Sequence, residues 1–110
     1  MGITYKEEIE DLRESPIVEL IHILNKNNYQ VKVFDPFVMQ FPDLIQDLSE
    51  AVVGSDLLIL GVAHTQFAMV NFKEFPQIMR HARLFDTRNF YEEKQIVNAG
   101  LTYHLLGNFT

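Results

Sequence analysis

The sequence predicts an α/β fold in which a parallel β-sheet has helices on both faces. Apolar runs of strand length alternate along the chain with stretches whose apolar residues recur at helical spacing. The clearest strand, Leu57 to Leu60, is continuously apolar, as expected for a parallel strand covered on both sides. Such alternation implies right-handed crossovers between the strands and places ligands at their carboxyl ends.

The amino-terminal part contains two predicted strands with a helix between them. Gly2 to Tyr5 is interpreted as the end of the first strand. Ser15-Pro16 begins the helix, with serine as N-cap and proline at the first helical position, and the helix should end near Asn27-Asn28. Val31 to Phe34 predicts the second strand, and Asp35-Pro36 closes it because this pair does not easily continue a regular element.

Further elements follow in the same alternation. An apolar stripe predicts a helix from Asp43 to Val52, which Gly54 terminates, and the Leu57 to Leu60 strand comes next. Phe72, Phe75 and Met79 indicate another short helix, broken at Pro76. The chain then returns to extended structure at Arg83 to Phe85 and ends that strand with Asp86-Thr87-Arg88, and a last strand is expected around Tyr103 and His104.

Composition limits what the chain can do. Its 110 residues suffice for one domain, residues 1–110, with a single core, and 47% of them are apolar. The absence of cysteine excludes disulfides, thiolate nucleophiles and cysteine zinc sites, and no clustered ligand set suggests another metal. A net charge of −6 argues against nucleic acid as a partner. No apolar run approaches the roughly 18 residues of a membrane span, so we expect a cytoplasmic protein without membrane attachment.

The loop from Lys6 to Glu14 occupies the position of the glycine fingerprint in a dinucleotide-binding fold, but it contains no glycine. The backbone therefore cannot approach a pyrophosphate closely, and we reject NAD binding here, although Asp35 superficially matches a ribose-binding acid. One interpretation is a solvated charged loop. The other is that Lys6 points into the ligand crevice while Asp11 and Arg13 brace the loop as a carboxylate–guanidinium pair.

Several of these segments resemble one family in order and spacing. Gly2-Ile3-Thr4-Tyr5-Lys6, followed by Asp11-Leu12-Arg13-Glu14-Ser15-Pro16, is similar to the "GLxFK…DxRxSP" signature that opens the C-terminal, UDP-binding domain of the UDP-glucose/UDP-N-acetylmannosamine/GDP-mannose dehydrogenases. The resemblance continues through Val33-Phe34-Asp35-Pro36, Ala63-His64 and Phe85-Asp86-Thr87-Arg88, and it covers essentially the whole chain. It implies a Rossmann-like sheet.

The resemblance also implies a function. These enzymes oxidise the C6 alcohol of a sugar to a carboxylate in two NAD-dependent steps, producing uronic acids, and both the cofactor and the catalytic cysteine belong to the N-terminal half. The C-terminal domain holds the nucleotide of the UDP-sugar. Carried over by residue, Lys6 and Arg88 would bind anionic substrate oxygens, and this chain would contain no catalytic residue. The ending Asp86-Thr87-Arg88 favours UDP over GDP, whereas the hexose stays open.

Structural roles are the alternatives to these assignments. For Arg88 the alternative is a surface salt bridge with Asp86 or Glu92, and His64 is more often a helix-capping or loop-packing residue than a functional one. Tyr103 and His104 are interpreted as structural residues.

Compared with the family, the chain lacks the dinucleotide-binding half, so the resemblance implies a fragment that is inactive alone. Strand one would be shortened at Met1, in a sheet of order 3-2-1-4-5-6 in which it is central. The alternative is a non-enzymatic remnant that folds and self-associates as a homo-oligomer without useful nucleotide binding.

Overall fold

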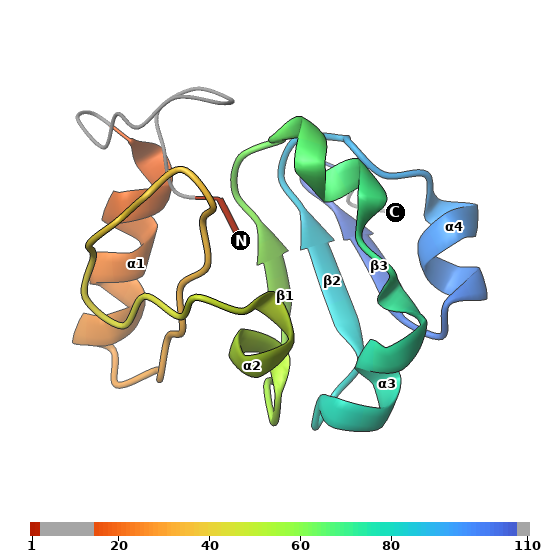
Figure 1. Cartoon of the computed structure of the whole chain (residues 1–110), viewed down its shortest axis with the longest axis horizontal. Coiled ribbons are helices and arrows are strands. Elements are labelled where there is room, and N and C mark those ends of the chain that lie inside the picture. Colours follow the sequence, from red (N-terminus) through yellow and green to blue (C-terminus); the bar gives the residue numbers. More distant parts are fainter. Residues whose placement is uncertain (3–14, 108–110) are drawn as a thin grey trace.

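The computed structural model describes residues 1–2 and 15–107 (Figure 1). Short strands alternate with helices and 3-10 turns along this part of the chain. In order, the elements are α1 (Pro16–Lys26), α2 (Leu48–Val52), β1 (Leu58–Leu60), η1 (Thr65–Met69), η2 (Phe72–Glu74), α3 (Phe75–Ile78), β2 (Arg83–Asp86), α4 (Glu93–Asn98) and β3 (Thr102–Leu105). The predicted α/β class with a parallel sheet is confirmed.

The three named strands form a parallel sheet in the order β1-β2-β3. Leu58 pairs with Leu84, and Leu84 pairs in turn with Tyr103. The segment from η1 to α3 lies in front of β2 and β3 in Figure 1, and α4 lies beside β3. All three strands therefore end at the same edge of the sheet, where loops can meet a ligand.

Backbone hydrogen bonds extend this sheet beyond β1. The Met1 nitrogen donates to the Ile59 carbonyl at 2.7 Å, and the Gly61 amide donates to the Met1 carbonyl at 2.8 Å. On the other side, the Gly2 amide donates to the Phe34 carbonyl at 2.9 Å. The chain at Met1 and Gly2 thus lies between the segment ending at Phe34 and β1. Leu44 in turn forms a parallel bridge with Val33. The extended segments therefore lie in the order Leu44, Val33, Met1-Gly2, β1, β2, β3, which agrees with the expected order 3-2-1-4-5-6 and its central first strand.

Helix α1 begins and ends where the sequence indicates. Ser15 is the N-cap, its hydroxyl accepts a hydrogen bond from the Val18 amide at 3.4 Å, and Pro16 follows at the first helical position. Asn27 is the C-cap, and Asn28 after it has a left-handed φ of 68°. Caps of these residue types satisfy backbone groups that the helix leaves unpaired.

Two predicted elements are shorter than expected. The helix from Asp43 to Val52 is confined to α2, because Asp43 has a φ of 64° and Leu44 forms a parallel bridge with Val33 instead of a helical turn. Among the described residues, the predicted strand at 31–34 appears as this isolated bridge of Val33 and not as a longer strand. The side chain of Asp47 accepts a hydrogen bond from the Ser49 amide and sets the actual helix start.

The later elements differ from prediction in detail. The region predicted as a helix from Phe72 to Met79 consists of a 3-10 turn and then α3, so the break lies before Phe75, and Pro76 stands at the start of α3, where proline is tolerated. Helix α4 was not predicted. Only Ile96 of its six residues is buried, and one buried position gives no helical stripe to recognise.

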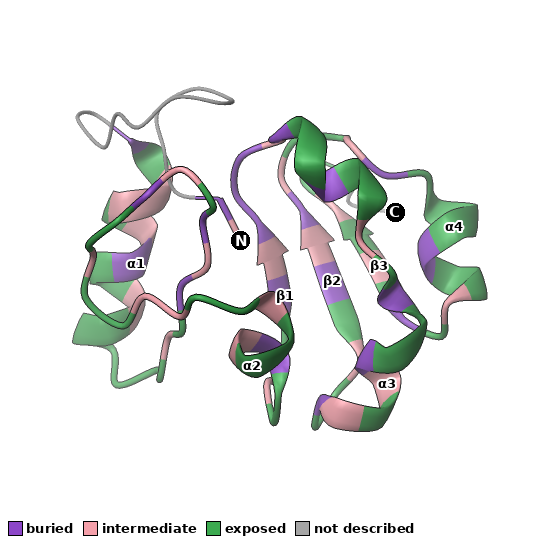
Figure 2. Ribbon diagram, in the orientation of Figure 1, coloured by how far each residue is buried: buried purple, intermediate pink, exposed green. Residues whose placement is uncertain are grey.

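The buried apolar side chains form two clusters, where a single core was expected. Buried positions occur both in the sheet and in α1 and the segment after it (Figure 2). The larger cluster packs the sheet against η1, η2, α3 and α4 and includes Leu60, Phe67, Leu84 and Ile96. The smaller one joins α1 to the segment after it through Ile21, Val33 and Val38. Met1 and Gly2 lie between the two halves and hydrogen-bond to both.

Position 2 requires glycine because of its left-handed backbone conformation and because neighbouring atoms leave no room for a Cβ. Its φ is 85°, and a Cβ there would lie 2.7 Å from the Val62 nitrogen. Replacing Gly2 by alanine should therefore lower the free energy of unfolding by about 2 kcal/mol or more, through left-handed strain plus the clash. Gly54→Ala is the matched control, because Gly54 also has a positive φ but open space around its Cα. Urea unfolding of both variants tests this, and equal losses would contradict the steric part.

Candidate functional site

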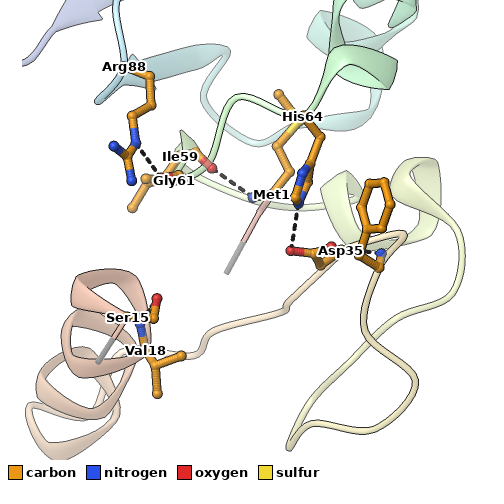
Figure 3. Close-up of polar contacts among 9 residues, drawn as sticks. Met1, Ser15, Val18, Asp35, Ile59, Gly61, His64 and Arg88 are labelled. Carbon is orange, nitrogen blue, oxygen red and sulfur yellow. Dashed lines mark hydrogen bonds and ion pairs between the residues drawn. The ribbon is translucent and has the colours of Figure 1, made fainter. Parts of the chain in front are cut away.

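Polar groups gather at the carboxyl edge of the sheet. Gly2 leads into the residues after strand one, Gly61 and His64 follow β1, and Arg88 follows β2. The amino end of α1, marked by Ser15, lies at the same edge (Figures 1 and 3). Since the carboxyl ends of parallel strands and the amino ends of crossover helices share one edge, this is where the fold can bind an anionic ligand.

The Asp86 carboxylate organises the end of β2. It is completely buried and accepts hydrogen bonds from the amides of Arg88, Phe90 and Tyr91 at 2.8–2.9 Å. The Tyr103 hydroxyl donates to it from β3 at 2.8 Å. Three amides and a hydroxyl stabilise this buried negative charge, because hydrogen bonds to the charged form offset its desolvation. The turn from 86 to 91 is thereby fixed to the sheet.

The same carboxylate affects two tyrosines. Burial raises the pKa of Tyr91, and the negative charge of Asp86 raises it further. Burial also raises the pKa of Tyr103, with additional contributions from its hydrogen bond to Asp86 and from the charge of Asp86. Tyr91 uses its hydroxyl to donate to the Phe67 carbonyl at 2.7 Å, which connects η1 to this turn. The structural role expected for Tyr103 is confirmed by these contacts.

The Arg88 side chain is exposed, and one hydrogen bond fixes its orientation. Its Nε donates to the Gly61 carbonyl at 3.0 Å, which links the turn after β2 to the residue that follows β1 (Figure 3). Within the described ranges no carboxylate forms an ion pair with it, and Asp86 accepts from its backbone amide rather than its guanidinium. The surface salt bridge considered for Arg88 is therefore not formed there. Because the bond uses Nε, the two terminal nitrogens of the guanidinium have no partner among the described residues. These two nitrogens form a planar fork, and that geometry favours bidentate binding of phosphate.

A buried pair lies behind this edge. His64 Nε2 lies 3.1 Å from Asp35 Oδ2, and neither side chain is exposed. The imidazole packs against the rings of Phe37 and Phe67, with centroids 4.6 and 5.3 Å away. Asp35 also accepts a hydrogen bond from the Phe37 amide at 2.8 Å. His64 is thus a loop-packing residue that joins the end of the second strand segment to the end of β1.

These contacts test whether NAD could bind here. A ribose-binding acid must present its carboxylate to two sugar hydroxyls, but Asp35 is 4% exposed and its oxygens face His64 and Phe37. Asp35 therefore does not fit that role. Residues 1–2 and 15–107 also include no group of three His, Asp or Glu side chains placed to hold a metal ion.

A hollow lies beside the turn from Asp86 to Tyr91, but the charges of its lining do not favour a phosphate. It has a volume of about 390 Å³, and its lining includes Glu92, Glu93 and Tyr103. Two carboxylates next to the buried Asp86 would repel an anion. The arginine side of the edge is therefore the better candidate.

Three of the predicted site residues, Lys6, Asp11 and Arg13, lie outside the described residues, as do Ile3 to Tyr5 of the predicted first strand. Arg88 lies at the expected strand end. The sequence interpretation missed the central role of Asp86 and the Asp35–His64 pair. An aspartate directly at a strand end, followed by a turn with a left-handed Asn89, is a local signal for the first, since aspartate commonly accepts from amides two residues on.

The described residues form a parallel α/β domain of Rossmann-like fold, with Arg88 at the carboxyl ends of its strands. The chain belongs to the UDP-glucose/GDP-mannose dehydrogenase family, whose UDP binding domain matches residues 1–93. Among curated proteins it is similar to the UDP-N-acetyl-D-mannosamine dehydrogenase of Methanococcus maripaludis, with 34% identity over 97% of this chain and 26% of that protein.

Solved structures give the same result. The UDP-D-ManNAc dehydrogenase of Pyrococcus horikoshii superposes with a TM-score of 0.82 and 27% identity over 96% of this chain and 24% of that one. The UDP-N-acetyl-mannosamine dehydrogenase of Staphylococcus aureus gives 0.81 and 29% over 97% and 25%. The chain thus spans about a quarter of the length of the relatives it matches. No helix within the described part is long and apolar enough to cross a membrane.

The buried carboxylate should dominate the stability of this edge. We expect Asp86→Asn to lower the free energy of unfolding by about 3 kcal/mol, because the amide cannot accept from every donor now facing the carboxylate. Asp56→Asn, at an exposed aspartate that pairs with Arg80, should change it by less than about 1 kcal/mol. Urea unfolding measures both, and a tolerant Asp86→Asn variant would show that the network contributes little.

The raised tyrosine pKa values predict a loss of stability at alkaline pH. The folded state favours protonated Tyr91 and Tyr103, so their contribution is complete below the ordinary tyrosine pKa of about 10 and is lost as pH rises above it. Tyrosinate absorbance should show both ionising only on unfolding. Tyr103→Phe should remove one late-titrating group. Ionisation of all tyrosines near pH 10 in the folded chain would contradict this.

Proposed function

We propose that the chain is the UDP-sugar-binding domain, residues 1–110, of an NAD-dependent nucleotide-sugar 6-dehydrogenase that makes uronic acids for polysaccharide synthesis. The observation that carries this proposal is the Arg88 guanidinium, held by the Gly61 carbonyl at the carboxyl edge of the sheet. Membership of the family and the names of its relatives support a UDP-sugar as the ligand. The protein acts in the cytoplasm, where nucleotide sugars are substrates.

The domain contributes affinity and orientation. A diphosphate requires cations at neighbouring strand ends, and Arg88 supplies a forked group after β2 while Lys6 supplies a point charge in the loop after strand one. Asp11 and Arg13 brace that loop. Chemistry belongs to the half of the enzyme that binds NAD and carries the catalytic cysteine, so the substrate must span both halves. The chain alone binds substrate without oxidising it.

Binding of UDP-glucose, measured by calorimetry or chemical-shift titration, should be weak, with a Kd of roughly 0.1 mM or higher, because half of a cleft supplies part of the contacts. Lys6→Ala and Arg88→Ala should each weaken it about tenfold. Arg88→Lys should also weaken it, because lysine keeps the charge but loses the fork. Arg80→Ala, which removes an exposed arginine that pairs with Asp56, is the control and should bind normally.

Two results would overturn the proposal. Unchanged affinity in both alanine variants, with their folds intact by circular dichroism, would remove Lys6 and Arg88 from the site. An absence of UDP-sugar binding in the parent chain at millimolar ligand would favour the non-enzymatic, self-associating remnant instead. NADH formation by the chain alone would refute the proposed division of labour.

A further inference from the structure

Two neighbouring carbonyls at the end of β1 accept hydrogen bonds from two neighbouring residues of the turn after β2. The Leu60 carbonyl accepts from Thr87, from its amide at 3.2 Å and from its hydroxyl at 2.6 Å. The Gly61 carbonyl accepts from Arg88 Nε at 3.0 Å (Figure 3). Thr87 therefore binds the residue directly before the one that orients the arginine.

The turn after β2 is fixed to its two neighbouring strands by different residues. The Asp86 carboxylate accepts from three amides of the turn and from a hydroxyl of β3, so its bonds hold the turn to β2 and β3. The bonds of Thr87 reach β1 instead, and Gly61 directly follows β1. Thr87 therefore controls the side of the turn on which the Arg88 side chain finds its acceptor.

The hydroxyl of Thr87 is the part of this contact that depends on the side chain. The amide bond to Leu60 continues the ladder of β1 and β2 beyond its last pair, Leu60 and Asp86, and any residue except proline can make it. The hydroxyl adds a second donor at 2.6 Å, near the short end of the range for O–H···O bonds. A β-branched side chain has few χ1 rotamers, so this bond restricts the residue before Arg88 at little cost in entropy.

The hydroxyl is not available to bind an anionic ligand. A hydroxyl carries one hydrogen, and Thr87 donates its hydrogen to the Leu60 carbonyl. The lone pairs that remain on its oxygen would repel phosphate oxygens. The two terminal nitrogens of Arg88, in contrast, have no partner among the described residues. Any effect of the Thr87 hydroxyl on an anion must therefore pass through Arg88.

We infer that Thr87 is a positioning residue for Arg88: its hydroxyl fixes the turn after β2 to the end of β1, so that Gly61 orients the guanidinium before a ligand arrives. The inference rests on the proposed function for the identity of that ligand, a UDP-sugar. A long arginine side chain loses conformational entropy when it binds an anion, and an arginine already held at Nε loses less of it. Thr87 thus raises affinity without touching the substrate.

Removal of the hydroxyl should leave the fold intact. The Leu60 carbonyl keeps the Thr87 amide as a donor, so no buried acceptor loses its last partner. Thr87 is half-buried, and valine replaces its hydroxyl by a methyl group of similar size. Thr87→Val should therefore disturb the position of Arg88 more than the stability of the domain.

The first test measures UDP-glucose binding by chemical-shift titration in the parent chain and in Thr87 variants. Thr87→Val should weaken binding about fivefold, the loss expected for one neutral hydrogen bond. Thr87→Ser keeps the hydroxyl and should bind within about twofold of the parent chain. In an Arg88→Ala background, Thr87→Val should have no further effect, because no guanidinium is left to position.

A second readout needs no ligand. Exchange of the Arg88 Nε hydrogen with solvent, measured by nuclear magnetic resonance, should be at least about threefold faster in Thr87→Val, because its bond to Gly61 opens more often. Arg83 supplies the matched internal control at the other end of β2. Its Nε donates to the Asp56 carbonyl at the same distance, 3.0 Å, and its exchange rate should not change.

Several results would overturn the role of Thr87. They are unchanged affinity in Thr87→Val, equal losses in the valine and serine variants, equal weakening by Thr87→Val with and without Arg88, and an unchanged Arg88 exchange rate. If the parent chain does not bind UDP-glucose, the proposed function fails, and the exchange rates alone decide whether Thr87 positions Arg88. If Thr87→Val does not fold by circular dichroism, Thr87→Ala takes its place in every comparison.

Discussion

The buried Asp86 carboxylate is the interaction on which the geometry of the candidate site depends. A charge with no exposure is tolerated only if donors replace its water, and here three amides of the following turn and the Tyr103 hydroxyl do so. The donors come from the turn after β2 and from β3, so satisfying one carboxylate fixes both. Arg88 lies in that turn, and its position relative to Gly61 follows from the constraint.

Gly61 and Gly2 supply the complementary constraint on the neighbouring strands. A Cβ at Gly61 would meet the Gly2 carbonyl and Ile17, and one at Gly2 would meet the Val62 backbone. The absence of side chains lets the first strand, β1 and the start of α1 approach closely. The Gly61 carbonyl is then left to accept from Arg88. Gly61 therefore has two roles. Its missing side chain permits close packing with Gly2 and Ile17, and its carbonyl orients Arg88.

Sequence patterns predicted those elements whose signals are local. Ser15-Pro16 specifies the start of α1 through a cap and a fixed φ, and the continuously apolar run from Leu57 to Leu60 indicates β1. The failures have a common cause. Asp43 to Val52 carries a helical stripe, but pairing of Leu44 with Val33, a tertiary contact, converts half of it to extended chain. Likewise the Asp35–His64 pair joins residues 29 positions apart, and no local spacing reveals it.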